Sequence, residues 1–321
     1  MGQIEVRRAE AGDASAVTAL LRTSLGKEDD PHYEDFLRWK HERNAFGPSP
    51  AWVAVDGERV VGYRTLLRWR FVDDAGKTLS AVRAVDTATD PDYRGRGIFR
   101  LLTLGAVADL TRAGDAFVFN TPNDQSRPGY LSMGWTPVRR LPVGVLPAGP
   151  DALVRMARSR VASRIWSEPT DVGIDAREAF MDDEVCTGLL SHAPKRGLRT
   201  DRSPAYLRWR TEFGPLAYRV LLADERDPAR GGVVFRVRKR GEGLEAVIAE
   251  LLTPSARVGL SLVSQVVASS GADYAIGLRT GRARGLLPLP GQGPLLTARP
   301  LARGIPKPEA WTLTMGDIEL F

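Results

Sequence analysis

The sequence is poor in cysteine and histidine, and it has no long apolar run. Its 321 residues include one cysteine and three histidines. A single cysteine excludes an intrachain disulfide framework and is typical of a reducing compartment. No apolar stretch approaches the roughly 20 residues of a membrane-spanning helix, and the N-terminus has no signal-peptide pattern. We therefore expect a cytoplasmic protein with no membrane partner.

The single cysteine also bears on chemistry. Cys186 lies among apolar residues, with no CxxC pattern and no histidine cluster nearby. Such a context favours a buried structural thiol over a nucleophile.

The charge of the chain is positive, with 45 Lys and Arg residues against 39 Asp and Glu residues. A net charge of +6 favours anionic partners such as nucleic acid or a phosphate-rich cofactor. The basic residues are spread along the chain without a polybasic block, which is typical of a solvated basic surface. Nucleic acid is therefore a disfavoured partner.

The length predicts two domains, since one domain usually has roughly 100 to 200 residues. Gly149 and Pro150 interrupt the pattern at mid-chain, and we place the boundary there, giving domains at 1–150 and 151–321. A basic helix over 151–166 is expected to connect them. The alternation of residues 311–321 predicts a closing strand.

Hydrophobic periodicity predicts the elements of the first half. The Asp56-Gly57 turn indicates a hairpin between two flanking strands. The expected strands are 3–7, 51–55, 60–64, 66–72, 80–87 and 116–119. The expected helices begin near residue 14 and cover 33–43 and 98–111.

The second half repeats features of the first. Residues 36–40, FLRWK, return as YLRWR at 206–210, and each copy is followed by Phe-Gly-Pro. Residues 60–64 and 114–118 also have counterparts, near 232–236 and 271–276. These similarities predict two related units.

A glycine-rich turn joins a predicted strand to a predicted helix in the first half only. Gly95 and Gly97 allow close backbone approach, and Arg94, Arg96 and Arg100 surround them. Unpaired N–H groups at a helix start favour a pyrophosphate. An exposed Arg-Gly turn is the alternative. The loop fits neither the Walker pattern nor the dinucleotide GxGxxG pattern, which disfavours ATP and NAD.

The segment Pro91-Asp92-Tyr93-Arg94-Gly95-Arg96-Gly97-Ile98 resembles the signature of the GCN5-related N-acetyltransferase (GNAT) family. The chain departs from that signature at Phe99, where the family prefers Gly or Ala. The Phe99 ring must then point away from the cofactor site or line it.

A second segment carries the same resemblance further along the chain. Asn123, Ser126 and Tyr130, followed by Met133-Gly134-Trp135, are similar to the family's run of Asn, small residue, Tyr and Gly-aromatic. The resemblance covers about residues 3–140, and it extends weakly to the second half as a degenerate copy without the glycine loop.

The resemblance implies a fold, a cofactor and a binding site. The fold would be α/β (α+β), with a mixed, mostly antiparallel central sheet flanked by helices and with tandem GNAT-like units. Acetyl-CoA would be the co-substrate, with no metal. The implied cofactor-binding residues are Thr87, Ala88, Thr89, Arg94, Gly95, Arg96, Gly97, Ile98, Phe99, Asn123 and Ser126.

The resemblance also implies two proton transfers. Tyr130 would be the general acid for the departing thiolate; its alternative is a packed aromatic. Asp86 is our candidate base, because partial burial could raise its pKa; the alternatives are a salt bridge to Arg83 or to another arginine, and a relayed water. We interpret His32 and His41 as exposed bystanders, and we name the C-terminal carboxylate of Phe321 as a less favoured base.

The sequence therefore predicts an N-acetyltransferase that acts on a primary amine of a small molecule, sugar or peptide. A non-catalytic acyl-CoA sensor is one alternative, and an aminoacyl-tRNA-dependent Fem-like ligase is another. A homodimer is an assembly that the sequence leaves open.

Overall fold

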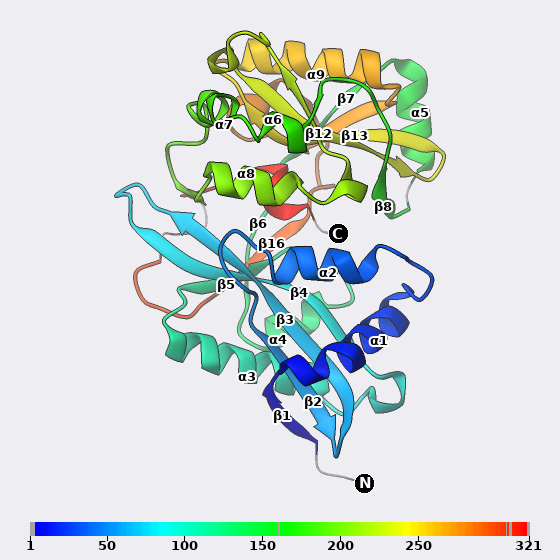
Figure 1. Ribbon diagram of the computed structural model, residues 1–321, viewed down its shortest axis with the longest axis vertical. Coiled ribbons are helices and arrows are strands. Elements are labelled where there is room, and N and C mark those ends of the chain that lie inside the picture. The colour runs from blue at the N-terminus through cyan, green and yellow to red at the C-terminus, as the bar shows by residue number, and fades with distance from the viewer. Residues whose placement is uncertain (1–3, 160, 306, 308–309, 320–321) are drawn as a thin grey trace. The chain divides into compact units, whose positions relative to one another are not determined.

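The computed structural model describes residues 4–159, 161–305, 307 and 310–319, and it divides the chain into two compact units (Figure 1). The first unit takes Met1–Phe71, Lys77–Arg139 and Leu295–Glu309, and the second takes Val72–Gly76, Arg140–Pro294 and Ala310–Phe321. The division differs from the predicted one at residue 150. The second unit begins its main part at Arg140, and a late segment returns to the first unit.

The first unit is built on a mixed sheet. β1 pairs with β2, β2 with β3 and β5 with β16 in antiparallel fashion, whereas β4 and β5 are parallel. β3 is one long strand where the sequence predicted two. In sheet order the strands are β1 (Glu5–Arg8), β2 (Ala51–Asp56), β3 (Arg59–Val72), β4 (Thr78–Thr89), β5 (Phe117–Asn120), β16 (Leu295–Pro300) and β6 (Thr136–Arg140).

Helices cover both faces of this sheet. Figure 1 shows α1 and α2 on the side of β3 that faces the viewer and α4 on the far side. α3 is the crossover between the parallel strands, and it buries Leu102, Ala106 and Leu110 against the sheet before Gly114 ends it at a φ of 84°. The helices are α1 (Ala14–Leu25), α2 (Tyr33–His41), α3 (Ile98–Ala113) and α4 (Arg127–Ser132).

The second unit has its own mixed sheet. β13 and β14 are parallel, and the pairs β15–β7, β7–β14, β13–β12, β12–β11 and β11–β9 are antiparallel. In order the strands are β15 (Leu287–Pro288), β7 (Val143–Pro147), β14 (Tyr274–Leu278), β13 (Gly243–Leu252), β12 (Gly232–Arg240), β11 (Arg219–Leu222) and β9 (Ile174–Asp175). β8 (Ser163–Glu168) pairs with β12, and β10 (Leu198–Thr200) pairs in parallel with β17 (Trp311–Thr312).

The helices of the second unit correct two predictions. The expected helix over 151–166 ends at Arg158, because the next residues form β8 against β12. The expected strand over 311–321 is only β17, since Thr314 and Asp317 form a capping box that starts α10. The helices are α5 (Pro150–Arg158), α6 (Ala176–Ala179), α7 (Asp183–Leu190), α8 (Pro204–Thr211), α9 (Ala256–Ser270) and α10 (Met315–Ile318).

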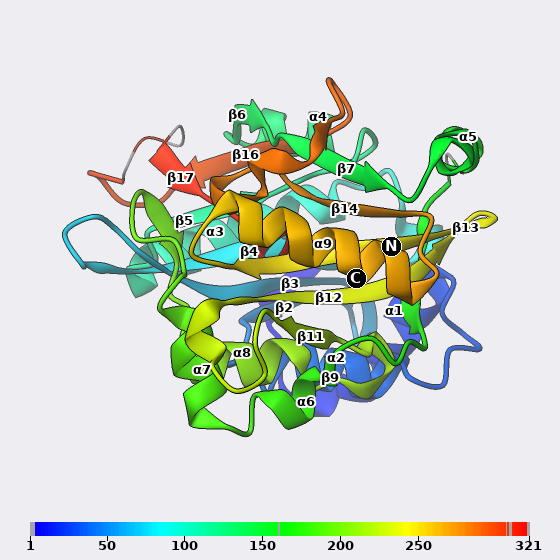
Figure 2. The same ribbon diagram turned by 90° about the horizontal axis from the view of Figure 1, so that it is seen from above.

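The two units share one succession of elements. β2, β3, β4, α3 and β5 in the first unit match β11, β12, β13, α9 and β14 in the second. Figure 2 shows α9 lying across β12 and β13, the strands whose apolar residues it covers. Each parallel pair is bordered by a strand from a distant part of the chain, β16 beside β5 and β7 beside β14. The units have therefore exchanged a strand.

Cys186 is fully buried in α7, where its thiol donates to the Phe180 carbonyl at 3.4 Å. Burial raises the pKa of the Cys186 thiol. This environment confirms a structural thiol. The helices among the described residues are too short or too polar to span a lipid bilayer.

Candidate functional site

The loop between β4 and α3 presents an open helix start. Gly95 and Gly97 both adopt a left-handed φ of 76°, a conformation that glycine tolerates best. Gly97 is the N-cap of α3, and no side chain accepts from the first N–H groups of this helix. A residue with a side chain at Gly97 would meet no atom within 4 Å, so the space beside the helix start is open.

Cationic side chains surround this helix start. Arg94, Arg96 and Arg100 are exposed. Arg96 stacks over the Tyr93 ring at 4.5 Å, and Arg100 donates to the Ser132 carbonyl at 3.3 Å. Together with the open N–H groups they form a positively charged surface that suits a phosphate.

In the second unit, a side chain caps the N–H groups at the start of α9, the helix that corresponds to α3. The N-cap of α9 is Ser255, whose hydroxyl accepts from the Val258 N–H at 3.3 Å. The helix start is therefore satisfied by the chain itself. This difference agrees with the interpretation that only the first unit carries a phosphate loop.

The strands β4 and β5 separate beside this loop. Their parallel pairing covers Ala81–Arg83 with Phe117–Phe119, and no pairing with β5 is found for the rest of β4. Thr87, Ala88 and Thr89 thus lie on the part of β4 past the paired region. A strand edge of this kind offers backbone hydrogen bonds to an extended ligand.

Asp86 distorts β4 at the point of separation. It adopts a φ of 35°, which is rare for a residue other than glycine. Its Oδ2 lies 2.7 Å from Lys40 Nζ and 2.8 Å from His41 Nε2, and both partners come from α2. The predicted salt bridge to Arg83 is therefore wrong, because Lys40 and His41 are the partners of Asp86.

The protonation of this cluster differs from expectation. Burial acts to raise the pKa of Asp86, but Lys40 and His41 outweigh it and hold that pKa well below its usual range. The predicted rise in the Asp86 pKa is therefore wrong in direction. Burial lowers the pKa of His41 despite its bond to Asp86, so the imidazole is neutral near pH 7. His41 is buried, which corrects its interpretation as an exposed bystander.

Tyr130 is packed against two groups of the first unit. It is buried in α4, and the Phe99 ring meets it edge to face at a centroid distance of 5.4 Å. A Cβ on Gly129 would lie 3.1 Å from the Phe99 ring. Phe99 thus lines the space between the start of α3 and α4 rather than pointing away.

Arg64 completes this packing. Its guanidinium carbon lies 5.5 Å from the Phe99 ring and 5.3 Å from the Tyr130 ring. Arg64 is fully buried, and none of its three side-chain nitrogens has a hydrogen-bond partner in the part of the chain that the structure describes. Two aromatic faces stabilise the cation by about 2 kcal/mol each at most, which does not offset its desolvation.

Asn123 and Ser126 organise the start of α4. Asn123 Oδ1 accepts from the Ser126 N–H at 2.8 Å and from the Ser126 hydroxyl at 2.9 Å. These contacts give both side chains a local role in ordering the turn before Tyr130.

The structure thus brings the glycine loop and the separated part of β4 to one end of the first sheet. Two side chains, Lys40 and Arg64, were missed from the sequence, and His41 was named there only as a bystander. A signal existed for both missed residues, since Lys40 falls on the stripe of Tyr33 and Phe36 in α2, and Arg64 alternates with Gly62 and Leu66 in β3. Phe321 lies outside the described residues. Within the described ranges, no group of three or more His, Cys, Asp or Glu side chains is placed to hold a metal.

Comparisons with known proteins agree with this geometry. The sequence model described as an acetyltransferase (GNAT) domain matches residues 5–138. This match confirms the resemblance predicted from the two motifs of the first half. A search of curated proteins gave no match.

Solved structures resemble the chain over most of its length. A GCN5-related N-acetyltransferase from Anabaena variabilis has a TM-score of 0.65 at 13% identity, covering 94% of this chain and 73% of its own. A probable N-acyltransferase from Enterococcus faecalis has a TM-score of 0.63 at 14% identity, covering 93% and 72%. Eis1 from Mycobacterium abscessus has a TM-score of 0.56 at 13% identity, covering 93% and 74%. At these identities the likeness concerns the fold, and the predicted fold class is confirmed.

Proposed function

We propose that this chain, which belongs through residues 5–138 to the GNAT acetyltransferases, transfers an acyl group from acetyl-CoA to a primary amine of a small molecule, sugar or peptide. The observation that carries the proposal is the open start of α3 beside the separated strands β4 and β5. A diphosphate and an extended amide chain are the two parts of coenzyme A that such a place would hold.

The residues present fit this cofactor. The N–H groups of Gly97, Ile98 and Phe99 would hold the diphosphate at the positive end of the helix, with Arg94 and Arg96 as added cations. The backbone of Thr87, Ala88 and Thr89 would pair with the pantetheine arm. Bound in this way, the thioester supplies the activated acyl group, and an N–H of β4 would stabilise negative charge that develops on its oxygen.

Tyr130 is the proposed general acid. When its hydroxyl gives a proton to the departing thiolate, the tyrosinate that forms lies against the buried Arg64 guanidinium. A cation that has no other partner stabilises that charge strongly in a low-dielectric site. Asn123 and Ser126 would act indirectly, by fixing the turn that positions Tyr130.

Asp86 would support the proton acceptor rather than accept the proton itself. An ion-paired carboxylate with a strongly lowered pKa is a weak base. We assign proton acceptance to His41, whose Nε2–H would donate to Asp86 and whose Nδ1 has no partner among the described residues. Asp86 would then hold the imidazole in the tautomer that exposes the Nδ1 lone pair.

One observation favours a second candidate function, that of an acyl-CoA sensor without turnover. The Phe99 ring packs against Tyr130 and Gly129. The family signature has Gly or Ala at the position of Phe99. A Phe99→Ala variant separates the two functions: turnover should rise severalfold if the ring only obstructs the thioester, and it should stay absent in a sensor.

The test of the proposal is calorimetry with acetyl-CoA, with tRNA as the probe for a Fem-like ligase. Gly97→Glu should abolish acetyl-CoA binding, because it places a carboxylate at the diphosphate site. Gly114→Glu is the matched control, since Gly114 has the same left-handed backbone and open surroundings at the opposite end of α3. Absence of heat with coenzyme A and with each of its thioesters would refute the proposal.

Turnover of an amine panel then tests the acid. Tyr130→Phe should reduce turnover by roughly a hundredfold or more while acetyl-CoA binding is kept, as expected for a lost proton donor. Unchanged turnover would remove Tyr130 from the mechanism and leave the cofactor loop unaffected.

A further inference from the structure

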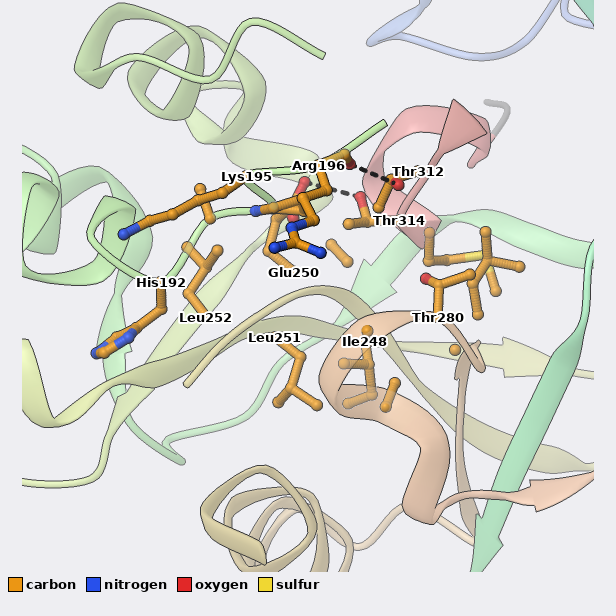
Figure 3. Close-up of a pocket in the computed structure, with 18 of the residues that line it drawn as sticks. His192, Lys195, Arg196, Ile248, Glu250, Leu251, Leu252, Thr280, Thr312 and Thr314 are labelled. Atoms are coloured by element: carbon orange, nitrogen blue, oxygen red, sulfur yellow. Dashed lines mark hydrogen bonds between the residues drawn. The ribbon is translucent and has the colours of Figure 1, made fainter. Parts of the chain in front are cut away.

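A cavity of about 640 Å³ lies within the second unit, where β13 and β14 separate (Figure 3). The two strands pair at Glu245–Val247 with Tyr274–Ile276, and the residues that follow on each strand line the cavity. The loop 191–196 and residues between 312 and 315 complete the wall, and all of these belong to the second unit. This volume suits a small organic molecule.

Glu250 places a buried carboxylate on the cavity. Its Oε1 accepts from Arg202 Nη2 at 2.9 Å and from the Thr314 hydroxyl at 2.9 Å. Its Oε2 is buried and has no hydrogen-bond partner among the described residues. Burial raises the pKa of Glu250; Arg202 opposes this rise and Asp317 adds to it. A buried carboxylate oxygen without a donor is unfavourable, so a ligand that donates to it would be stabilised.

The first unit shows which donor suits this position. Asp86 and Glu250 each stand three residues past the last parallel pair of their sheet, at Arg83 and Val247. In the first unit an ammonium group fills the place beside the carboxylate, with Lys40 Nζ at 2.7 Å from Asp86.

In the second unit the cation beside the carboxylate is a guanidinium, because Arg202 forms a buried ion pair with Glu250 at 2.9 Å. The sequence repeat puts Arg210 of α8 at the position of Lys40. Arg210 forms an ion pair with Glu319 at 3.5 Å instead. No lysine forms an ion pair with Glu250 in the described part of the chain. Arg202 occupies Oε1 of Glu250, so Oε2 is the oxygen left to accept from the ammonium group of a ligand.

The remaining wall defines the rest of the ligand. Lys195 and Arg196 are exposed where the loop borders the cavity, and Figure 3 shows Arg196 and Glu250 in the same part of the pocket. Two cations disfavour a simple polyamine and favour an anionic group on the same molecule. Ile248, Leu251 and Met315 add an apolar surface, which favours an apolar body between the two charges.

We propose that the second unit binds a small peptide-like zwitterion in this cavity, with its ammonium group on Glu250 and its carboxylate near Lys195 and Arg196. An apolar side chain of the ligand packs against Ile248 and Leu251. The site is separate from the proposed acyl transfer, and it gives the degenerate unit a binding role of its own.

The probe is the dipeptide alanyl-leucine, titrated by calorimetry into the full chain. Two blocked forms report the two charges: N-acetyl-alanyl-leucine lacks the ammonium group, and alanyl-leucinamide lacks the carboxylate. Blocking the amine should weaken binding by roughly tenfold to a hundredfold, the range expected for one charge-assisted hydrogen bond. Equal binding of the acetylated form, or no heat with the free dipeptide at millimolar concentration, would overturn the proposal.

Variants locate the binding in the second unit. Glu250→Gln should abolish the preference for the free amine, and its Oε1 can still accept from Arg202 and Thr314. Arg196→Ala should weaken only the carboxylate-bearing forms, with the exposed Arg226→Ala as a control that changes nothing. Arg196 is exposed, so its variant keeps the test decisive if Glu250→Gln does not fold. Binding that Tyr130→Phe changes and both cavity variants leave unchanged would assign the dipeptide to the first unit instead and overturn the proposal.

Discussion

The Asp86→Asn variant distinguishes a structural role of this residue from a chemical one. The side chains of Lys40 and Asp86 are only 4% and 10% exposed, so the variant leaves a buried ammonium without its counter-charge. Removing one partner of a buried ion pair costs about 3–5 kcal/mol of unfolding free energy. Asparagine keeps the size of aspartate and tolerates the left-handed backbone at this position. The loss would therefore reflect charge rather than strain.

The pH dependence follows from the two pKa shifts. The Asp86 pKa is lowered on folding, so its contribution is complete above the unfolded value near 3.8 and is lost as pH falls through the folded value. The His41 pKa is also lowered, so His41 adds no pH dependence above 6.5, and below 6.5 protonation of the unfolded chain lowers the stability of the folded state. The parent should lose stability in two stages on acidification, and Asp86→Asn should lack the stage below about pH 4.

The measurement is urea unfolding followed by the fluorescence of Trp39, Trp52 and Trp69, which are all buried in the first unit. The double variant Asp86→Asn/Lys40→Met removes both charges and should recover most of the lost stability. Acetyl-CoA binding serves as the control for an intact loop. A loss below 1 kcal/mol for Asp86→Asn, or no recovery in the double variant, would refute the assignment of a buried ion pair.

Three further outcomes follow from the first unit. Arg64→Met should raise the unfolding free energy by about 1 kcal/mol or more, because it removes an unpaired buried cation. The same variant should lower turnover at least tenfold. A loss of stability in urea would contradict the expected rise in unfolding free energy. A chain of residues 1–150 should aggregate, because the edge of β5, which carries Phe117 and Phe119, is uncovered without β16. When residues 295–305 are joined to the end of this chain, size-exclusion chromatography should show a monomer again. Folding of the unjoined chain would show that β16 is dispensable. His41→Gln should lower turnover and remove from its pH profile the acidic limb that arises when His41 is protonated, and an unchanged profile would exclude His41 as the proton acceptor.

Local patterns account for what the sequence could predict. The start of α3 at Ile98 follows from two closely spaced glycines, Gly95 and Gly97, before an apolar-periodic run, and its end follows from Gly114. The hairpin of β2 and β3 follows from the Asp56-Gly57 turn. Each of these features depends on residues close together in the chain, where propensity and turn chemistry decide the conformation.

The parts that the sequence did not predict depend on distant contacts. Asp86 meets Lys40 and His41 across more than forty positions of the chain, so its neighbourhood and its pKa could not follow from the apolar strand around it. The partners of β5 and β14 could not be predicted either, because pairing with β16 and β7 is set by sheet edges that exist only after folding. The short segments 163–168 and 311–318 have structures that depend on the sheet or the cap that they join.

The exchanged strands have a consequence for how the protein is made. Residues 1–139 emerge from the ribosome long before residues 295–300 are made. The first sheet therefore lacks β16, the strand that pairs with β5, throughout most of synthesis. Completion of the first sheet then waits until residues 295–300 are made, and nascent chains carry an open sheet edge that a chaperone could cover. The same dependence means that gene fission between the halves would separate each sheet from one of its strands.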